Sequence, residues 1–317
     1  MTQRSFTNNF EVVDSTKELS LLPQTWTLLG ESGLFKDEYL TQSTVTFQEI
    51  SGSLSIVKDQ VRGSKPQTQG NDVRKLHSYT TTHHPLFDAL YPDDIAGKSA
   101  YNDLSAADTE AAALVRKMTK IRKSFDVTKE LARFQTLVTG QAWSPNGTIA
   151  ADYYTDFGIT RKVVNFDLST STTDVTDKCE EVIASFQASA NDGVIITSVT
   201  AYCSPAFFSK LIKHAKVQQA YTYYSASEGQ SILRNRAGGM GLYRKFTFAN
   251  VNFIEVPTVL AGNTLIPSGD AYFVADAEDD SFVTYYSPAN RFGLVNTIAM
   301  LQYMFQYRDP RNTEITI

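Results

Sequence analysis

One segment of this chain, residues 105–139, runs for roughly 35 residues without proline or glycine, about 50 Å at the usual helical rise. Ser105 and Asp108 resemble a capping box at its start, and Gly140 stands just past its end. A mean globular helix is about a third of this length. Its apolar residues keep helical spacing and then slip; they are Leu114, Met118, Ile121, Phe125, Leu131, Phe134 and Val138.

The one-sided apolar stripe predicts a single helix over 105–139 that lies as a spine on a sheet. A coiled coil and an ordinary core helix remain as alternatives. The flanking cations predict a solvated basic face; they are Arg116, Lys117, Lys120, Arg122 and Lys123. The slip in the stripe suggests a bend near 124–127, with Ser124, Phe125 and Asp126 as hinge candidates.

A long two-stranded ribbon is predicted before this helix. Residues 39–61 alternate in polarity, residues 62–72 form a polar tip with two glycines and one proline, and residues 73–82 are extended again. Because an isolated two-stranded ribbon is marginal in water, a long one needs support from outside the subunit. A hairpin folded back on its own domain is the alternative.

The remaining pattern mixes helices and strands. Residues 1–35 are irregular, with a short amphipathic stretch near 19–29 that needs a partner surface. Helices are predicted at 174–189 and 204–216, and a hairpin at 141–157. Strands are predicted at 161–168, 194–202, 244–256, 271–275, 282–307 and 314–317.

Composition and charge exclude several classes of protein. A net charge of -5 argues against a sequence-independent nucleic-acid binder, but not against a container for nucleic acid. No apolar run is long enough to span a membrane, and residues 1–10 lack a signal peptide's apolar core. Cys179 and Cys203 suit a reducing compartment, and we expect two buried free thiols, with a disulfide between them left open.

No segment of the sequence carries a convincing catalytic, cofactor-binding or metal-binding motif. His83 and His84 are neighbours and would point to opposite faces of a strand, a poor geometry for one metal ion. The glycine-rich run 238–241 lacks phosphate-loop spacing, and the acidic run 276–280 lacks the ligand pattern of an EF-hand. Zinc-hydrolase, zinc-ribbon and nucleophile-elbow motifs are absent. We therefore expect no catalytic, cofactor or metal site, and a structural role rather than an enzyme.

Several short motifs, in this order, carry a resemblance to a known family. Phe35–Leu40 leads into Ile56–Gly63, Leu137–Gly140 ends the long helix, Lys162–Asp167 follows as a hydrophobic-Asp strand, and Asp309-Pro310 precedes the terminal strand. From about residue 30 to the end, the chain resembles the Hong Kong 97 type shell fold of tailed-phage capsids. More specifically it is similar to the lambda-type major capsid protein, or head protein E, family. Asn165 stands where that family often has an acidic residue.

The resemblance implies an α+β Hong Kong 97 type fold. Its expected parts are an N-terminal arm (1–35), an extended β-ribbon loop (36–85), a peripheral domain with the spine helix 105–139 (86–170), an axial α/β domain (171–282), and a long strand returning to the peripheral domain with a closing strand (283–317). Candidate contacts between subunits are Arg62, Lys65, Lys58, Trp26 and Phe35. Lys58 and Lys65 lie in the loop that cross-links some relatives, but we expect no cross-link here.

The implied function is that of the major capsid protein of a tailed double-stranded DNA bacteriophage. Such subunits assemble as hexamers and pentamers into an icosahedral shell, in the bacterial host cytoplasm, and reside in the virion. A portal protein and separate scaffolding and decoration proteins are the expected partners, with no membrane and no sequence-specific DNA binding. An encapsulin-like nanocompartment is the first alternative; a soluble hydrolase and a phage tail or sheath component are the others.

Overall fold

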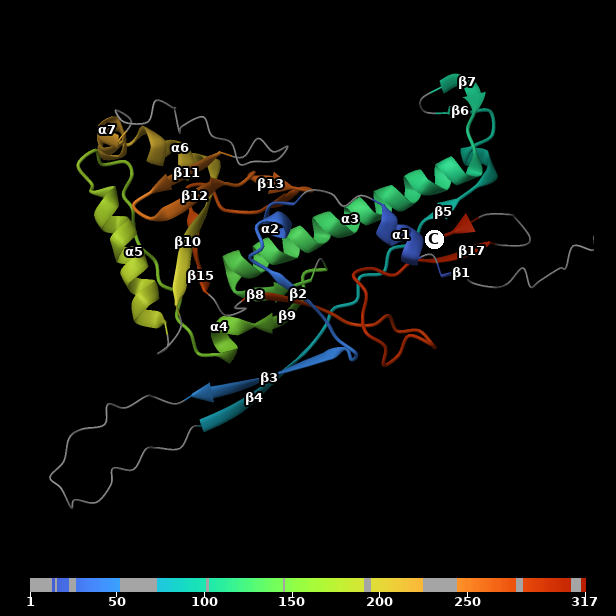
Figure 1. The fold of residues 1–317 in the computed structure, drawn as a ribbon, viewed down its shortest axis with the longest axis horizontal. Coiled ribbons are helices and arrows are strands. Elements are labelled where there is room, and N and C mark those ends of the chain that lie inside the picture. Colours follow the sequence, from blue (N-terminus) through green and yellow to red (C-terminus); the bar gives the residue numbers. More distant parts are fainter. Residues whose placement is uncertain are drawn as a thin grey trace, which may run out of the picture.

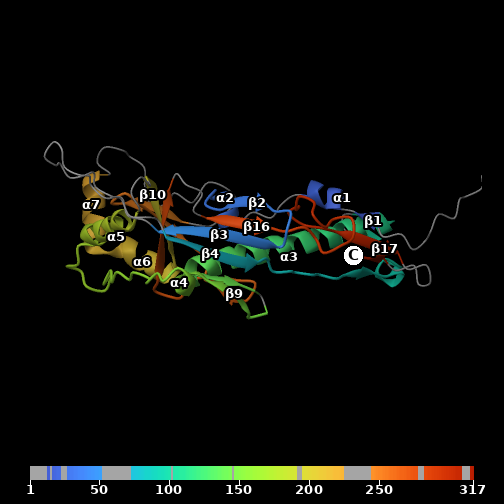
Figure 2. The same ribbon diagram turned by 90° about the horizontal axis from the view of Figure 1, so that it is seen from below.

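The computed structural model describes residues 13–14, 16–22, 27–51, 73–100, 103–144, 146–190, 195–224, 244–277, 282–308 and 315–317. The molecule is long and thin: Figure 1 shows its broad face and Figure 2 its narrow edge. One long helix, α3, runs between two lobes, and a β-ribbon projects from the body beside it.

Helix α3 spans Glu110–Thr139, 30 residues, and is continuous in Figure 1. The Thr109 side chain caps its start by accepting from the Ala112 amide at 3.2 Å, and Gly140 ends it with a left-handed φ of 72°. The prediction that the helix begins at Ser105 is wrong. Strand β7 (Asp103–Ala107) occupies that stretch and pairs with β6 (Ser99–Ala100), while the Asp108 carboxylate binds Arg116.

A four-stranded sheet, in the order β11-β12-β10-β15, forms one lobe. The central strand β10 (Ile196–Cys203) runs parallel to β12 (Val251–Glu255) and antiparallel to β15 (Ala271–Ala277). Strand β11 (Lys245–Phe248) joins β12 through a tight turn in which Ala249 and Asn250 have φ of 47° and 61°. That left-handed turn is the type that two-residue hairpins prefer.

Three helices pack with this sheet: α5 (Val175–Ser189), α6 (Pro205–Lys213) and α7 (Ala215–Tyr224). The side chains of Asp174 and Ser204 cap α5 and α6, so each helix begins one residue after its predicted start. The predicted helix through Lys216 is broken at His214, whose ψ of 131° is extended, so two helices replace one. The main core lies between helices and sheet; its fully buried members include Val175, Cys179, Ala201, Cys203, Phe208, Leu211, Val251 and Phe253.

A second sheet, in the order β1-β17-β18-β5, lies at the other end of α3. It joins β1 (Val13–Asp14), β17 (Phe305–Arg308), β18 (Ile315–Thr316) and β5 (Ala89–Leu90). The predicted closing strand is thus confirmed. Two short helices, α1 (Thr16–Leu21) and α2 (Leu28–Glu31), contact α3 and bury Leu19, Leu28 and Leu29.

Three predicted strands are wrong. Residues 244–256 form two strands, β11 and β12, because the turn at Ala249 and Asn250 interrupts the predicted one. Residues 282–307 form two separate strands, β16 (Val283–Tyr286) and β17, with turns between them; β16 pairs in parallel with β2 (Lys36–Tyr39). Residues 161–168 form neither helix nor strand and have no ladder partner among the described residues, although Phe166 is buried and Val163 exposed; Asp167 has a left-handed φ of 38° and residue 168 begins a turn. Every second side chain of this stretch, at 164, 166 and 168, is at least partly buried, and this alternation resembles that of a paired strand.

The remaining elements are small. The hairpin of β8 (Gln141–Trp143) and β9 (Ile149–Asp152) is confirmed, and α4 (Tyr153–Asp156) follows it. A 3₁₀ turn covers Pro92–Asp94, and β13 (Val259–Leu260) pairs with β14 (Asn263–Thr264). None of the helices in the described ranges is long and apolar enough to cross a membrane.

Candidate assembly surface

The predicted ribbon is present as strands β3 (Thr44–Ser51) and β4 (Val73–Thr80). They pair antiparallel in unbroken register from Thr44 opposite Thr80 to Ser51 opposite Val73. The pair forms a sheet of its own, and Figure 1 shows it projecting from the body. Each strand therefore keeps one edge unpaired within the described part of the chain.

The inner face of the ribbon base rests on aromatic side chains. Between ring centroids, Phe47 lies 5.5 Å from Tyr285 and Tyr79 lies 5.7 Å from Tyr153. The ribbon residues Phe47 and Tyr79 are both half-buried. Such edge-on ring pairs each stabilise by about 0.5–1.5 kcal/mol beyond the area they bury. We call this group the aromatic seat; its members are Phe47, His77, Tyr79, Tyr153, Phe157 and Tyr285.

Polar contacts reinforce the aromatic seat. The Tyr79 hydroxyl donates to Asp156 Oδ2 at 2.8 Å, and burial together with this bond raises the pKa of Tyr79 to about 12. His77 contacts the Glu49 carboxylate at 2.9 Å on the same face. Thr81, just after the ribbon, bonds to Ser43 and Ser287. The base of the ribbon is thereby fixed to its own subunit.

The outer face of the ribbon is exposed and carries few charges. Its side chains are small or uncharged apart from Arg74, and Leu76 among them is 70% exposed. The exposed residues of this face are Thr44, Thr46, Gln48, Arg74, Leu76, Ser78 and Thr80. An extended face of this kind, with free edges, is a template for contact with another chain.

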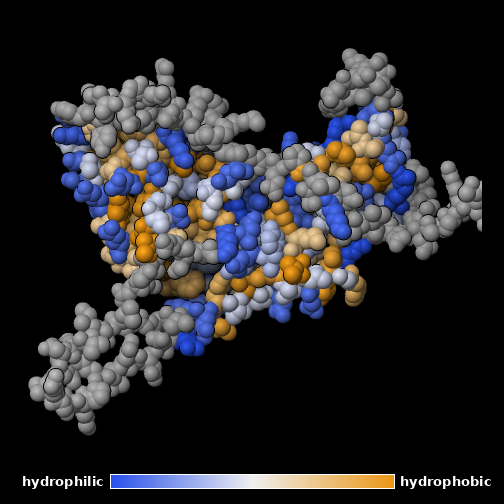
Figure 3. Space-filling model, viewed as in Figure 1, coloured by the Kyte–Doolittle hydropathy of each residue, from blue (hydrophilic) through white to orange (hydrophobic). Residues whose placement is uncertain are grey.

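The loop between β16 and β17 is a second exposed apolar surface. Phe292 is fully exposed, Ile298 is 70% exposed, and Val295 and Met300 are about half exposed. Across the visible face in Figure 3, apolar side chains reach the surface on both lobes. Monomeric soluble proteins rarely expose such groups together, so contact with another protein is indicated.

Four of the five predicted contact residues, Arg62, Lys65, Lys58 and Trp26, lie outside the described residues. The fifth, Phe35, packs within the subunit: its ring lies 5.5 Å from Phe282 and 5.1 Å from the Arg133 guanidinium. Its part in a subunit contact stays a prediction.

The hinge candidates lie inside α3. Ser124 is exposed and its hydroxyl donates to the Lys120 carbonyl at 3.1 Å, Phe125 is half-buried and Asp126 is 2% exposed. Thr128 bonds back to the Ser124 carbonyl in the same way. Side-chain bonds of this kind often bend helices. The geometry is compatible with a bend, which stays a prediction.

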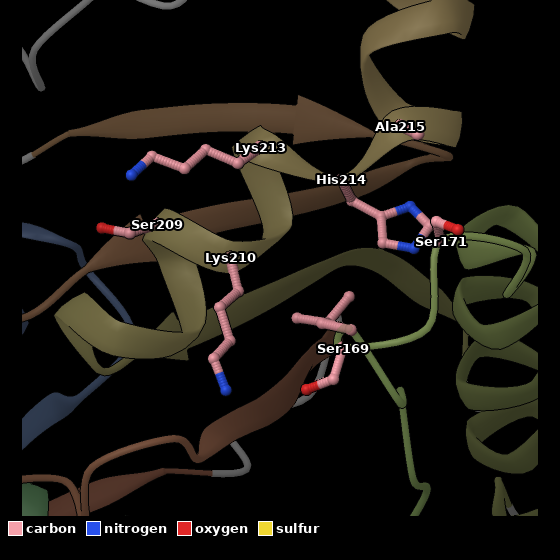
Figure 4. A pocket seen from close by; sticks show the side chains of 8 residues that line it. Ser169, Ser171, Ser209, Lys210, Lys213, His214 and Ala215 are labelled. Atoms are coloured by element: carbon pink, nitrogen blue, oxygen red, sulfur yellow. The ribbon is translucent and has the colours of Figure 1, made fainter.

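A depression of about 350 Å³ beside α6 and α7 does not assemble a reactive site. Figure 4 shows the ammonium groups of Lys210 and Lys213 pointing away from His214. His214 Nε2 donates to the Thr170 carbonyl at 3.0 Å, which fixes the ring in the structure. Within the described ranges no three His, Cys, Asp or Glu side chains are grouped to hold a metal ion, and both cysteines are buried free thiols.

The outer face of the ribbon and the exposed apolar loop between β16 and β17 are thus suited to contact with other protein chains. Comparison with known proteins leads to the same view. The family described as phage major capsid protein E matches residues 11–317. The chain belongs to this family. The predicted kinship is therefore confirmed, and this phage capsid protein is a component of the virion.

Two curated relatives are major capsid proteins. That of Pseudomonas phage KPP10 is 38% identical over 327 residues, covering 99% of this chain and 92% of the relative. That of Salmonella phage Felix O1 is 26% identical over 341 residues, with the same coverage. These findings support the major capsid protein interpretation and not the encapsulin alternative.

Two solved phage structures are also similar. The cyanophage A-1(L) capsid asymmetric unit matches with a TM-score of 0.46 and 11% identity, covering 93% of this chain and 89% of that chain. A Mycobacterium phage Che8 chain matches with a TM-score of 0.45 and 12% identity, covering 100% and 91%.

Sequence reasoning missed two groups of residues in this capsid protein. The aromatic seat could have been found from the period-two spacing of His77 and Tyr79 on one strand. A row of charged residues buried on α3 carries only the weak signal of the slipped apolar stripe; its members are Arg122, Asp126, Glu130 and Arg133. Its acidic members, Asp126 and Glu130, stand at helical spacing where apolar side chains are expected.

Proposed function

We propose that this capsid protein assembles as hexamers and pentamers into an icosahedral shell that encloses the double-stranded DNA genome of a tailed phage. The observation that carries the proposal is the β3–β4 ribbon, fixed at its base by the aromatic seat and exposed on its outer face. A second copy of the chain is the surface that supports its outer face and free edges.

Physical arguments support this arrangement. A two-stranded ribbon is marginal alone, so contact with a neighbour stabilises both its strands and the assembly. Each contact is small, but a closed shell repeats it many times, and simultaneous contacts raise the effective concentration of each one. The net charge of -5 suits a wall that encloses DNA without binding it tightly.

The expected division into arm (1–35), ribbon loop (36–85), peripheral domain (86–170), axial domain (171–282) and returning segment (283–317) belongs to this proposal. So do Arg62, Lys65, Lys58 and Trp26 as contact residues. Single exposed ion pairs contribute only about 0–1 kcal/mol, so these cations would set register more than strength.

The partners beyond the shell itself are proposed from the family resemblance alone. They are a portal protein and separate scaffolding and decoration proteins, with assembly in the host cytoplasm. We propose no enzymatic activity and no covalent cross-link. Assembled particles boiled in detergent should therefore give only monomer bands, and a ladder of bands would contradict this.

Leu76 allows a sharp test of the ribbon. Leu76→Asp places a charge on the exposed outer face without touching the aromatic seat, so the subunit should fold normally but fail to form shells. Leu76→Met keeps the side chain apolar and of similar size, and should assemble like the natural protein. Negative-stain electron microscopy and light scattering report assembly, and circular dichroism reports folding.

Closed particles or rings of five and six from the natural chain and Leu76→Met, but not from Leu76→Asp, would support the proposal. A natural chain that stays monomeric at every concentration, with or without added scaffold, would overturn it. Equal assembly of Leu76→Asp would remove the outer ribbon face from the interface.

A further inference from the structure

The turn between β8 and β9 carries an asparagine followed directly by a glycine. Asn146, Gly147 and Thr148 are all exposed, and Figure 2 shows β9 at the edge of the body. The Ser144 amide donates to the Thr148 carbonyl at 3.1 Å, which continues the pairing of β8 with β9 into the turn. Gly147 supplies the left-handed φ of 85° that closes it. The side chain of Asn146 therefore starts from a defined backbone in contact with water.

That side chain reaches forward past the next peptide bond. Its Oδ1 accepts from the Thr148 amide at 3.1 Å and from the Thr148 hydroxyl at 2.7 Å. Because both donors belong to residue 148, the carboxamide lies alongside the Gly147 peptide between them. Donors placed at a carbonyl oxygen stabilise the negative charge that develops there when a nucleophile attacks the carbon. Cγ of Asn146 is thus prepared for attack.

The nearest backbone nucleophile is the nitrogen of Gly147, and little crowds it. Glycine has no Cβ, and a Cβ built at this position would meet no atom within 4 Å. Attack of this nitrogen on Cγ closes a five-membered ring. The turn therefore holds an electrophilic carbon, two donors for its oxygen and an uncrowded nucleophile on neighbouring residues.

One hydrogen bond opposes the attack. The Gly147 amide donates to the Ser144 carbonyl at 2.9 Å, and its hydrogen must leave before the nitrogen bonds to Cγ. Losing one such bond slows a reaction about fivefold. The two bonds to Oδ1 strengthen as that oxygen becomes negative, because charge-assisted hydrogen bonds are about twice as strong as neutral ones. Two strengthened bonds outweigh the one that is lost.

From this geometry we infer that Asn146 is a site of spontaneous deamidation, promoted by the two donors of Thr148. Hydroxide removes the Gly147 amide proton, the nitrogen bonds to Asn146 Cγ, and the carbonyl electron pair moves to Oδ1. Its return expels ammonia, which takes a proton from water and restores the hydroxide, and a cyclic imide remains. Water then opens either imide carbonyl and leaves aspartate or isoaspartate at position 146.

The modification changes the charge and shape of the turn. Each event replaces a neutral carboxamide with a carboxylate on an exposed surface of the subunit. The isoaspartate product also lengthens the backbone by one methylene group, which disturbs the pairing of Ser144 with Thr148. The inference does not rest on the proposed function, because every group involved lies in one turn of one chain.

Asn165 provides a comparison within the same molecule. It is exposed, and its Oδ1 accepts from the Asp167 amide at 3.1 Å, the same forward reach. Residue 167 has no hydroxyl to serve as the second donor, and the following residue is Phe166, whose buried side chain crowds the peptide nitrogen. Asn165 should therefore deamidate much more slowly than Asn146.

Peptide mapping by mass spectrometry tests the inference on the folded, unassembled chain kept at mildly alkaline pH. Residue 146 should gain the mass of deamidation before residue 165 does, and an isoaspartate-specific methyltransferase should label it. Thr148→Val keeps the shape of the side chain but removes the hydroxyl, so deamidation should slow about fivefold or more. Thr148→Ser keeps the donor and should react at the natural rate, and circular dichroism checks that the variants fold.

The same measurement in denaturant separates the geometry of the turn from the sequence. Once the turn is lost, the natural chain and Thr148→Val should deamidate at the same rate. Equal rates of these two chains when folded would overturn the inference, as would a difference that persists in denaturant. An Asn146 that reacts no faster than Asn165 in the folded chain would overturn it as well. None of these results depends on whether shells form.

Discussion

Replacing Tyr79 with alanine should free the ribbon from the body of the subunit. The change removes the two contacts that join Tyr79 to the body, the ring contact with Tyr153 at 5.7 Å and the 2.8 Å bond to Asp156. At about 0.5–1.5 kcal/mol for the ring pair and about 1 kcal/mol for the hydrogen bond, the loss comes to about 1.5–2.5 kcal/mol. The equilibrium between docked and free ribbon should shift by about 10- to 70-fold.

Hydrogen exchange measures this shift, because the ladder amides of Thr44–Ser51 and Val73–Thr80 are protected only while the ribbon is ordered. In Tyr79→Ala these amides should exchange faster, while those of β10 stay as protected as in the natural chain. Tyr79→Phe keeps the rings and loses only the hydroxyl, so it should lie within about tenfold of the natural chain. Unchanged ribbon exchange in Tyr79→Ala, or equal loss of protection in β10, would refute the aromatic seat as the ribbon's anchor.

Three further predictions follow from local geometry. Gly140→Ala should lower the free energy of unfolding by about 2–5 kcal/mol in thermal or denaturant unfolding, since φ is 72° and the new Cβ would lie 2.0 Å from the Tyr154 ring. Gly147→Ala is the control: φ is 85° but no atom lies within 4 Å, so the free energy of unfolding should fall by only about 1–2 kcal/mol. Equal losses in the two variants would contradict the clash with Tyr154. Neither cysteine should react with iodoacetamide at pH 8 until the chain unfolds, because burial raises the pKa of Cys179 to about 12 and that of Cys203 well above its ordinary value; rapid native labelling would refute this. Burial raises the pKa of Tyr202 to about 12, so its contribution to stability is complete below pH 10 and lost between about pH 10 and pH 12; Tyr202→Phe should therefore lose less stability over that interval in unfolding experiments, and an identical decline would contradict the shift.

Elements whose signals are local could be predicted from the sequence. Asp174 and Ser204 cap their helices because an N-cap side chain needs only the next few amides. Gly147 takes the left-handed φ of 85° that the predicted turn requires. The ribbon could be predicted because alternation and a turn-rich tip lie in one continuous stretch. The family could be predicted because its short motifs occur in order.

Elements that depend on distant partners could not be predicted in this way. Alternation at 161–168 indicates one buried side, which Phe166 supplies, but it does not reveal whether a strand lies alongside. The apolar run at 282–307 mixes a short strand, β16, with exposed loop residues such as Phe292. The apolar residues of this run lie partly in the core and partly on the exposed surface. The sequence of one chain does not show which apolar residues belong to which.

Helix α3 shows what its slipped apolar stripe means physically. Of the cations predicted to form a solvated face, Arg116 binds Asp108, Lys117 binds Asp88 at 3.0 Å, and Arg122 is buried. Where the stripe slips, the buried face includes Asp126 and Glu130, and Glu130 accepts a hydrogen bond from the Leu29 backbone amide of α2. A gap in the apolar repeat of a long helix thus indicates a change in what packs on it: apolar side chains cover one stretch, and backbone polar groups bind buried charged side chains on the next.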